Sequence, residues 1–418
     1  MGKTFAEKVL SRAAGYDAAA NQVVTVEPDW CMSHDNAGPI SRTFKKIGVK
    51  EVWNPDKIVI IFDHAVPAAV SDHALNHKDA REFAAAQGIK NFYDVNSSGG
   101  VCHQKMCEEG YALPGLVIIG SDSHTCTYGA FGAFGTGVGR TEMAATWATG
   151  KIWLKVPESV KINVSGEFAK GVTSKDFILK LIGDLKADGA DYMSVEFHGP
   201  GVEENMTLAD RMTICNMGVE FGAKNAVCKP DKKVLDAVSR NARCGWEAVW
   251  ADDDAVYAAG YDYDLGALVP AVAKPHTVDN YAPVSEVAGV KIHEVFLGSC
   301  TNGRIEDLRQ AAEILKGKKV AVRTIVTPAS WKIYRGAMKE GLLDTLLDAG
   351  CTICNPGCGA CVGNHQGILA PGETAVSTAN RNFKGRMGDK DSFIYLGSAY
   401  TAAASALKGE IADPREVL

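Results

Sequence analysis

Short apolar runs rich in β-branched residues alternate along the chain with segments of helical periodicity, and this alternation restricts the possible folds more than any other feature. It is typical of βαβ units, in which helices connect parallel strands and cover the sheet. The sequence therefore predicts an α/β fold with parallel or mixed sheets, whose ligands bind beyond the carboxyl ends of the strands. Strands are predicted at residues 57–62, 116–119, 295–297, 321–326 and 374–377, and helices at 71–87 and 305–315.

Two changes in composition predict domain boundaries. Near residues 155–158 a helical segment over 141–153 gives way to an alternating strand over 160–166. Around residues 274–283 two prolines among polar residues predict a linker. A chain of 418 residues is long enough for two or three domains of ordinary size. We predict three α/β domains, at 1–158, 159–283 and 284–418.

Charge and hydropathy exclude two classes of partner. The chain has 44 Lys and Arg residues against 50 Asp and Glu residues, a net charge of −6, and carries no long run of like charges. A nucleic-acid partner is therefore not expected, because such proteins present a basic patch. No apolar stretch approaches the roughly 20 residues that cross a bilayer, and the first residues lack the apolar core of a signal peptide. We predict a cytoplasmic protein with no membrane partner.

The twelve cysteines need an explanation, because a reducing cytoplasm does not favour a disulfide framework. Four of them lie between residues 351 and 361. A structural zinc site with four thiolates is one interpretation, although its two Cys-x2-Cys pairs would be unusually close together. The spacing does not match that of a bacterial ferredoxin. The four are Cys351, Cys354, Cys358 and Cys361.

A second interpretation combines only two of these thiols with a remote one. Cys358 and Cys361 would be joined by Cys300, which ends a predicted strand and precedes a Thr-Asn-Gly turn, the expected place for a site. Three thiolates on a cluster of four irons would leave one iron without a protein sulfur, able to act as a Lewis acid. The remaining cysteines are interpreted as small buried hydrophobes, with Cys351 and Cys354 left open.

Seven motifs in a fixed order resemble the aconitase family, most closely the large subunits of its 3-isopropylmalate dehydratase and homoaconitase group. The resemblance extends over about residues 32–397. It implies a hydro-lyase with a [4Fe-4S] cluster on Cys300, Cys358 and Cys361, one iron of which is not bound by cysteine. The motifs are Phe62-Asp63-His64, Cys102-His103-Gln104, Ser121-Asp122-Ser123-His124-Thr125, Thr213-Ile214-Cys215-Asn216-Met217, Gly298-Ser299-Cys300-Thr301-Asn302, Gly357-Cys358-Gly359-Ala360-Cys361 and Asn380-Arg381-Asn382-Phe383-Lys384-Gly385-Arg386.

Dehydration of a hydroxy acid requires an acid for the departing hydroxyl, a base for the proton and cations for the carboxylates. Asp63 and His64 directly follow the strand at 57–62, and a carboxylate beside an imidazole keeps that imidazole protonated. This pair is similar to the family's acid. By the same resemblance the catalytic residues are Asp63, His64, His103, Asp122, His124 and Glu220.

Two arginines follow the strand at 374–377 and can bind carboxylates with two hydrogen bonds each. Asn216 and Glu220 are four residues apart, which predicts that they share one face of a helix. The resemblance implies that His34, Ser123, Arg381 and Arg386 bind the substrate and that Asn216, Asn302 and Asn380 neighbour the cluster.

Two local departures bear on the substrate. His34 stands where mitochondrial aconitases have a glutamine, and Ser123-His124-Thr125 is not followed by their Pro-Asn; both weaken a citrate assignment. A serine-hydrolase reading of Ser123 fails because the Gly-x-Ser-x-Gly motif is absent, and a dinucleotide loop fails because Arg140 replaces its third glycine. The resemblance favours interconversion of 2- and 3-isopropylmalate in leucine biosynthesis, with homoaconitate hydration or 2,3-dimethylmalate dehydration as alternatives.

The resemblance also predicts a partner. Aconitases are longer and end in a fourth, swivelling domain that supplies the base and further arginines, whereas this sequence ends at Leu418 after the third predicted domain. A separate small subunit is therefore expected to complete the site for a small hydroxy-dicarboxylate or tricarboxylate. An iron-sensing RNA-binding protein is an alternative of a different class, and the negative net charge argues against it.

Overall fold

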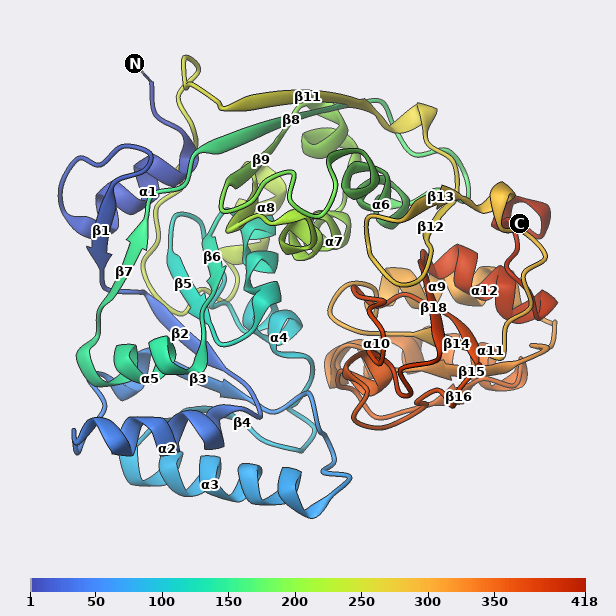
Figure 1. The fold of residues 1–418 in the computed structure, drawn as a ribbon, viewed down its shortest axis with the longest axis horizontal. Helices are drawn as coiled ribbons and strands as arrows, with labels where there is room; N and C mark the ends of the chain where they lie inside the picture. Colours follow the sequence, from blue (N-terminus) through green and yellow to red (C-terminus); the bar gives the residue numbers. More distant parts are fainter. Residues whose placement is uncertain (1) are drawn as a thin grey trace.

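The computed structural model describes residues 2–418, and within them the strands form four sheets (Figure 1). The first is a five-stranded parallel sheet in the order β4-β3-β2-β5-β6. Its inner strands are short, apolar and buried, as expected for a sheet covered on both faces. The strands are β2 (Trp30–Ser33), β3 (Ile58–Ile61), β4 (Asn91–Tyr93), β5 (Val117–Gly120) and β6 (Phe134–Gly137), with helices α2 (Ala37–Ile47), α3 (Ser71–Gln87), α4 (Cys102–Glu108) and α5 (Arg140–Thr149).

The second sheet is four-stranded and parallel, in the order β10-β9-β8-β11. Helix α6 begins with a capping box, in which the Thr173 hydroxyl and the Asp176 carboxylate bond each other's backbone N–H groups. The elements are β8 (Ser159–Ser165), β9 (Ser194–His198), β10 (Asn225–Cys228) and β11 (Ala259–Asp264), with helices α6 (Ser174–Leu185), α7 (Leu208–Asn216) and α8 (Lys232–Val238).

The third sheet has seven strands in the order β13-β12-β18-β17-β14-β15-β16 and is mixed, because β12 runs antiparallel to both of its neighbours. The segment predicted as a linker at 274–283 includes β13, so it is the turn and strand of a hairpin on this sheet. The strands are β12 (Ala271–Ala273), β13 (Tyr281–Pro283), β14 (Glu294–Leu297), β15 (Arg323–Val326), β16 (Thr352–Ile353), β17 (Thr374–Ser377) and β18 (Phe393–Gly397), with helices α9 (Ile305–Leu315), α10 (Trp331–Lys339), α11 (Leu342–Asp348) and α12 (Ala399–Lys408).

A small two-stranded sheet corrects one expectation. The helix predicted over 141–153 ends at Thr149, because Gly150 adopts a left-handed conformation with φ of 71°. Residues Ile152–Lys155 then form β7, which pairs antiparallel with β1 (Val23–Val26), next to helix α1 (Phe5–Ala14). The predicted helices at 71–87 and 305–315 are found with the same bounds. The three predicted domain ranges remain predictions.

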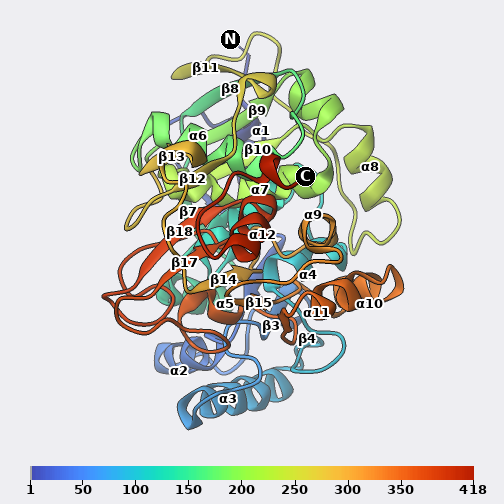
Figure 2. The ribbon, with the colours of Figure 1, turned by 90° about the vertical axis from the view of Figure 1, so that its right-hand side faces the viewer.

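The carboxyl ends of strands in the first sheet face the carboxyl ends of strands in the third sheet. The loops after β3 and β5 of the first sheet and after β14 and β17 of the third sheet contribute to one cavity. Turned by 90°, the third sheet and its helices lie in front of the rest of the molecule (Figure 2). Among residues 2–418 no helix combines the length and apolar character needed to span a bilayer.

Candidate active site

The cavity where these strand ends meet has a volume of about 370 Å³ and brings together most of the predicted site residues. Its position at the carboxyl ends of parallel strands is the one expected for ligand sites in α/β folds. Three thiols and several titratable groups share the lining within this small volume. The predicted residues in the lining are His34, Asp63, His64, His103, Asp122, His124, Cys300, Cys358, Cys361, Asn380, Arg381 and Arg386.

The carboxylate of Asp122 is the centre of a histidine network. Its Oδ1 lies 2.8 Å from His103 Nε2 and 3.4 Å from His124 Nδ1, and its Oδ2 lies 3.4 Å from His64 Nε2. Burial alone would raise the pKa of Asp122, but these imidazoles hold it well below its usual value. A single charged carboxylate therefore orients three imidazoles from three segments of the chain.

The segment after β3 is held in place by a second carboxylate, Asp35. Its Oδ2 accepts the backbone N–H groups of Asp63 and His64 at 2.8 and 2.7 Å. Its Oδ1 accepts Ala65 N–H at 3.1 Å and lies 2.6 Å from His77 Nε2. Both oxygens are occupied, so Asp35 positions its neighbours. Sequence reasoning assigned no role to Asp35 or His77, because Asp35 acts by binding backbone N–H groups, which a motif does not reveal, and His77 acts through Asp35.

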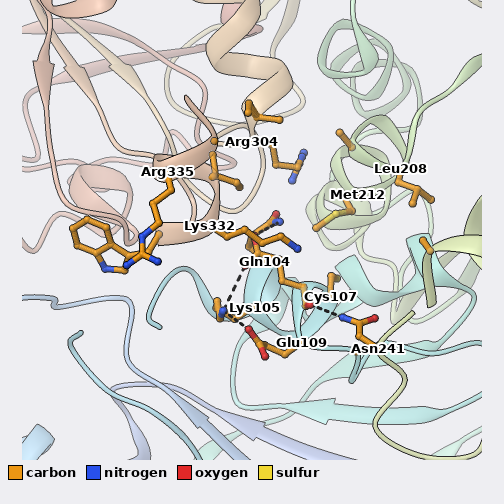
Figure 3. A pocket seen from close by; sticks show the side chains of 18 of the residues that line it. Gln104, Lys105, Cys107, Glu109, Leu208, Met212, Asn241, Arg304, Lys332 and Arg335 are labelled. Atoms are coloured by element: carbon orange, nitrogen blue, oxygen red, sulfur yellow. Dashed lines mark hydrogen bonds and ion pairs between the residues drawn. The ribbon is translucent and has the colours of Figure 1, made fainter. Parts of the chain in front are cut away.

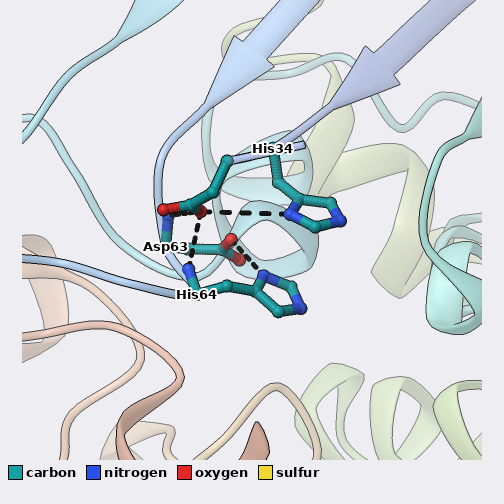
Figure 4. Close-up of side chains that lie close together, drawn as sticks. His34, Asp63 and His64 are labelled. Atoms are coloured by element: carbon teal, nitrogen blue, oxygen red, sulfur yellow. Dashed lines mark hydrogen bonds and ion pairs between the residues drawn. The ribbon is translucent and has the colours of Figure 1, made fainter. Parts of the chain in front are cut away.

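His64 is fixed by this arrangement and points into the cavity. Its Nδ1 lies 2.6 Å from Asp63 Oδ1, and its ring stacks on His34 with centroids 4.0 Å apart (Figure 4). Burial alone would lower the pKa of His64, but the negative charge of a Cys358 thiolate and the carboxylates of Asp63 and Asp122 raise it well above the usual value. Burial and the neighbouring His64 lower the pKa of His34 to about 4. The two stacked rings therefore differ in charge at neutral pH, with His64 cationic and His34 neutral.

Glu220 connects the region around the second sheet to the site. Its Oε1 lies 2.6 Å from His124 Nε2, and Arg381 Nε donates to its Oε2 at 3.0 Å. Burial would raise the pKa of Glu220, but His124 and Arg381 lower it. Asn216 ends α7 and Glu220 lies in a following 3-10 turn, so the prediction that they share one helix face is wrong. Both side chains are nevertheless buried beside the cavity.

Donors lie beside two of the three thiols in the lining, Cys300 and Cys361, whereas Cys358 Sγ lies 3.6 Å from Asp63 Oδ2 and 3.8 Å from His64 Nδ1. The amides of Asn216 and Asn380 each place Nδ2 3.2 Å from Cys300 Sγ, and Arg386 Nη2 lies 3.9 Å from Cys361 Sγ. Burial raises the pKa of Cys300 to about 12, so a thiolate there requires the positive charge of bound iron. These donors suit sulfurs that carry negative charge, which is the chemistry of a thiolate-bound iron–sulfur group.

The spacing of the thiols argues against zinc. Within residues 2–418, one group of three or more candidate ligands brings its atoms within 4.8 Å of one another, and it contains no cysteine. A tetrahedral zinc ion with sulfurs at about 2.3 Å would hold them about 4 Å apart. Cys300, Cys358 and Cys361 would instead each bind a different iron of a [4Fe-4S] cluster. The group found comprises His34, Asp35, Asp63 and His64, the hydrogen-bonded set already described.

Four of the predicted residues lie outside the cavity lining: Ser123, Asn216, Glu220 and Asn302. The Asn302 amide donates to Asp307 Oδ1 at 2.9 Å and does not contribute to the lining. Ser123 begins the 3-10 segment Ser123–Phe131 without contributing to the lining. The structure therefore joins twelve of the predicted residues directly in one cavity, while Asn216 and Glu220 contact that set from behind.

A larger cleft of about 1,000 Å³ lies on the other side of α4 (Figure 3). Gln104, Lys105 and Cys107 line it, whereas the neighbouring His103 lines the smaller cavity. Arg335 and Lys332 from α10 and Met212 from α7 also border it (Figure 3). The predicted catalytic and thiol residues are not part of this lining.

Comparison with known proteins gives consistent results. The family described as "Aconitase family (aconitate hydratase)" matches residues 7–291 and 285–409. A Methanopyrus kandleri protein named 3-isopropylmalate dehydratase large subunit 1 is 52% identical, with 100% of each chain covered. A Methanosarcina mazei protein named probable methanogen homoaconitase large subunit is 52% identical over 93% of this chain and 99% of its own. In fold, the chain resembles the crystal structure of Thermococcus kodakaraensis aconitase X, with a TM-score of 0.50, 11% identity, and 92% and 93% of the chains covered.

Proposed function

Since the chain belongs to the aconitase family, we propose that it is the cluster-bearing large subunit of a 3-isopropylmalate dehydratase, which interconverts 2- and 3-isopropylmalate by dehydration and rehydration. The observation that carries the proposal is the single cavity in which three thiols face a carboxylate bound by three imidazoles. Full-length relatives with that name support the choice of substrate.

Cys300, Cys358 and Cys361 would hold a [4Fe-4S] cluster, which supplies a Lewis-acidic iron for the substrate's hydroxyl and carboxylate. His64 is the proposed acid for the departing hydroxyl, because its neighbours keep it protonated and its Nδ1 is held by Asp63. His103 and His124 are oriented by Asp122 to hold the hydroxyl and water at this position. Glu220 holds His124 in place through the contact between its carboxylate and His124 Nε2.

The substrate's carboxylates are assigned to the two arginines that follow β17. Arg386 lines the cavity, and its buried Nε has no hydrogen-bond partner among the described residues. An unpartnered buried guanidinium nitrogen is costly, and a bound carboxylate would satisfy it. Arg381 is steered toward the cavity by Glu220, with Nε 3.0 Å from its carboxylate. Neutral His34 is proposed to contact the substrate through its ring.

A small subunit is proposed as the partner that closes the site and supplies the base. The relatives' names describe large subunits, which supports this arrangement. Ser121 lines the cavity, but its hydroxyl is engaged with Asn36 Oδ1 at 2.8 Å and does not present a free base. The catalytic complex is therefore expected to contain both chains.

The test is anaerobic reconstitution of the cluster, followed by assay of isopropylmalate turnover with and without the small subunit. We expect activity only with both chains, and a matched C358S chain with the same subunit is expected to be inactive. Full activity of the large chain alone would overturn the partner proposal. Failure of the reconstituted pair to convert isopropylmalate would overturn the substrate proposal.

A homoaconitase is the second candidate, because two relatives at 52% and 47% identity carry the name probable methanogen homoaconitase large subunit. The same reconstituted pair should be assayed with homoaconitate and 2,3-dimethylmalate in parallel. A kcat/KM for homoaconitate above that for isopropylmalate would replace the first proposal with the second. We expect the reverse order.

A further inference from the structure

Lys175 is a completely buried lysine in the first turn of α6, on the second domain, and no predicted motif includes it. Its Nζ donates to the backbone carbonyls of Thr378 and Ala379 at 3.0 and 2.6 Å. Within residues 2–418 no carboxylate oxygen pairs with this ammonium. The lysine thus places a positive charge in the interior with only neutral partners.

A buried ammonium without a negative partner is strongly disfavoured, because carbonyl dipoles replace only part of its hydration. Burial accordingly lowers the pKa of Lys175 to about 7. Lys105 provides a contrast within the same chain. It is buried as well, but its Nζ lies 2.6 Å from the Glu109 carboxylate. Lys175 therefore requires a source of negative charge that lies beyond its direct contacts.

The backbone groups that Lys175 binds belong to a loop that contacts the thiols. The two carbonyls it binds immediately precede Asn380 and Arg381, and the Asn380 amide lies 3.2 Å from Cys300 Sγ. The Thr378 hydroxyl also connects this loop to the loop after β14, because it accepts a hydrogen bond from Gly298 N–H at 2.9 Å. Asp307 is the strongest negative charge acting on Lys175, and next come Cys300 and Cys361, which carry negative charge when their sulfurs are thiolates. Three thiolates on a cluster would place net negative charge on the far side of this loop.

We propose that Lys175 is a positioning residue of the iron–sulfur site: its ammonium fixes the loop that presents Asn380 and Arg381, and the charge of the bound cluster balances the charge of Lys175 across that loop. The inference rests on the proposed cluster but not on the identity of the substrate. Helix α6 contributes no residue to the cavity lining. The inference gives it a role in setting the reduction potential of the cluster and in retaining the cluster.

The test compares K175M with the control K105M in the reconstituted full chain, using a redox titration of the cluster followed by electron paramagnetic resonance. Removing a positive charge makes addition of an electron less favourable, so K175M should shift the reduction potential to a more negative value. K105M, which removes a lysine already neutralised by Glu109, should leave the potential unchanged. Loss of iron to a chelator should be about 10-fold faster in K175M, the lower end of the effect of outer-shell substitutions at metal sites.

Thermal unfolding with and without the cluster provides a second readout that does not depend on activity. K175M should lower Tm more in the loaded chain than in the cluster-free chain, whereas K105M should lower both equally. K175Q, whose amide can still donate to the loop, covers the case in which K175M does not fold, and it should show the same shift in potential. An unchanged potential in the folded variant, with equal losses of Tm in the two states, would overturn the proposal.

The outcomes separate this inference from the proposed function. A wild-type chain that assembles the cluster but fails to convert isopropylmalate would remove the proposed substrate and leave the role of Lys175 intact. A wild-type chain that takes up no iron and sulfide would overturn both.

Discussion

Helix α4 separates two cavities of very different character. His103 lines the smaller cavity of about 370 Å³, and the adjacent Gln104 and Lys105 line the larger cleft of about 1,000 Å³. In the smaller cavity Asp63, His64 and Asp122 are buried or partly buried and are paired with one another. Around the larger cleft, cations such as Lys332 and Arg335 are exposed to solvent. Volume alone would select the wrong cavity.

This difference indicates that a catalytic site is marked by closely spaced titratable groups that shift one another's pKa values. In the small cavity the pKa of Asp122 is lowered and that of His64 is raised, because each faces opposite charge within a buried space. Exposed lysines and arginines at the rim of the large cleft are solvated and contribute little. If this comparison is correct, matched substitutions on the two sides of α4 should have very unequal consequences.

The largest effect is expected for a thiol of the small cavity. C358S should prevent assembly of the cluster and abolish activity, because a serine hydroxyl does not replace the thiolate. C107S, which alters a thiol bordering the large cleft, should keep its iron and sulfide. Iron and sulfide analysis with absorption spectra of both variants checks the pair. Normal cluster content in C358S would show that the thiol assignment is wrong.

The next effect is expected at the histidine network. D122N removes the charge that orients three imidazoles and should lower kcat by about 10²- to 10⁴-fold, the range for loss of acid–base function. The control is E108Q, on the large-cleft side of α4, for which we expect kcat to stay close to the wild-type value, because this carboxylate bonds Gln104, Lys105 and Ser330 and no residue of the small cavity. Equal losses in both variants would contradict the assignment of the chemistry to the small cavity.

An intermediate effect is expected for the substrate-facing arginine. R386K keeps the charge but loses the planar pair of donors, so KM should rise about 10-fold, equivalent to about 1.4 kcal/mol. R335K, on the rim of the large cleft, should leave KM unchanged. Steady-state kinetics of the reconstituted pair measures both. A rise in KM for R335K would show that the large cleft also contacts substrate.

Much of this comparison could be predicted from the sequence. Asp63, His64, Asp122 and Arg381 directly follow apolar runs, so their convergence at strand ends follows from the rule for parallel sheets. The resemblance to the aconitase family, and the α/β fold it implied, are confirmed by the match over residues 7–291 and 285–409 and by the structure. The roles of individual site residues stay predictions.

Other features could not be predicted because they depend on tertiary contacts. Asp35 acts by accepting backbone N–H groups of Asp63 and His64, which any residue type would offer. Lys175 reaches the loop after β17 from a helix about 200 residues earlier in the chain, so no local pattern marks it. The periodicity that placed Asn216 and Glu220 on one helix failed because α7 ends at Asn216 and continues as a tighter 3-10 turn.

The smallest effect on activity is expected for a substitution of His34. It allows a comparison of two stacked histidines within the small cavity. Burial and His64 lower the pKa of His34 to about 4, so its ring is neutral at pH 7, and the neutral amide of H34Q should keep kcat/KM within about 3-fold of wild type. H64Q removes a cationic acid from the same stacked pair and should lose about 10²-fold or more.

The same substitution has a signature in stability. Because the folded pKa of His34 lies below the unfolded value of about 6.5, folding excludes a proton, and His34 costs stability as the pH falls from about 6.5 to 4. H34Q removes this cost, so between pH 7 and pH 4.5 it should lose less unfolding free energy than wild type, by on the order of 2 kcal/mol. Urea unfolding at the two pH values measures the difference. Parallel losses in wild type and H34Q would mean that folding leaves the pKa of His34 unchanged, and the contrast between the two stacked histidines would then be wrong.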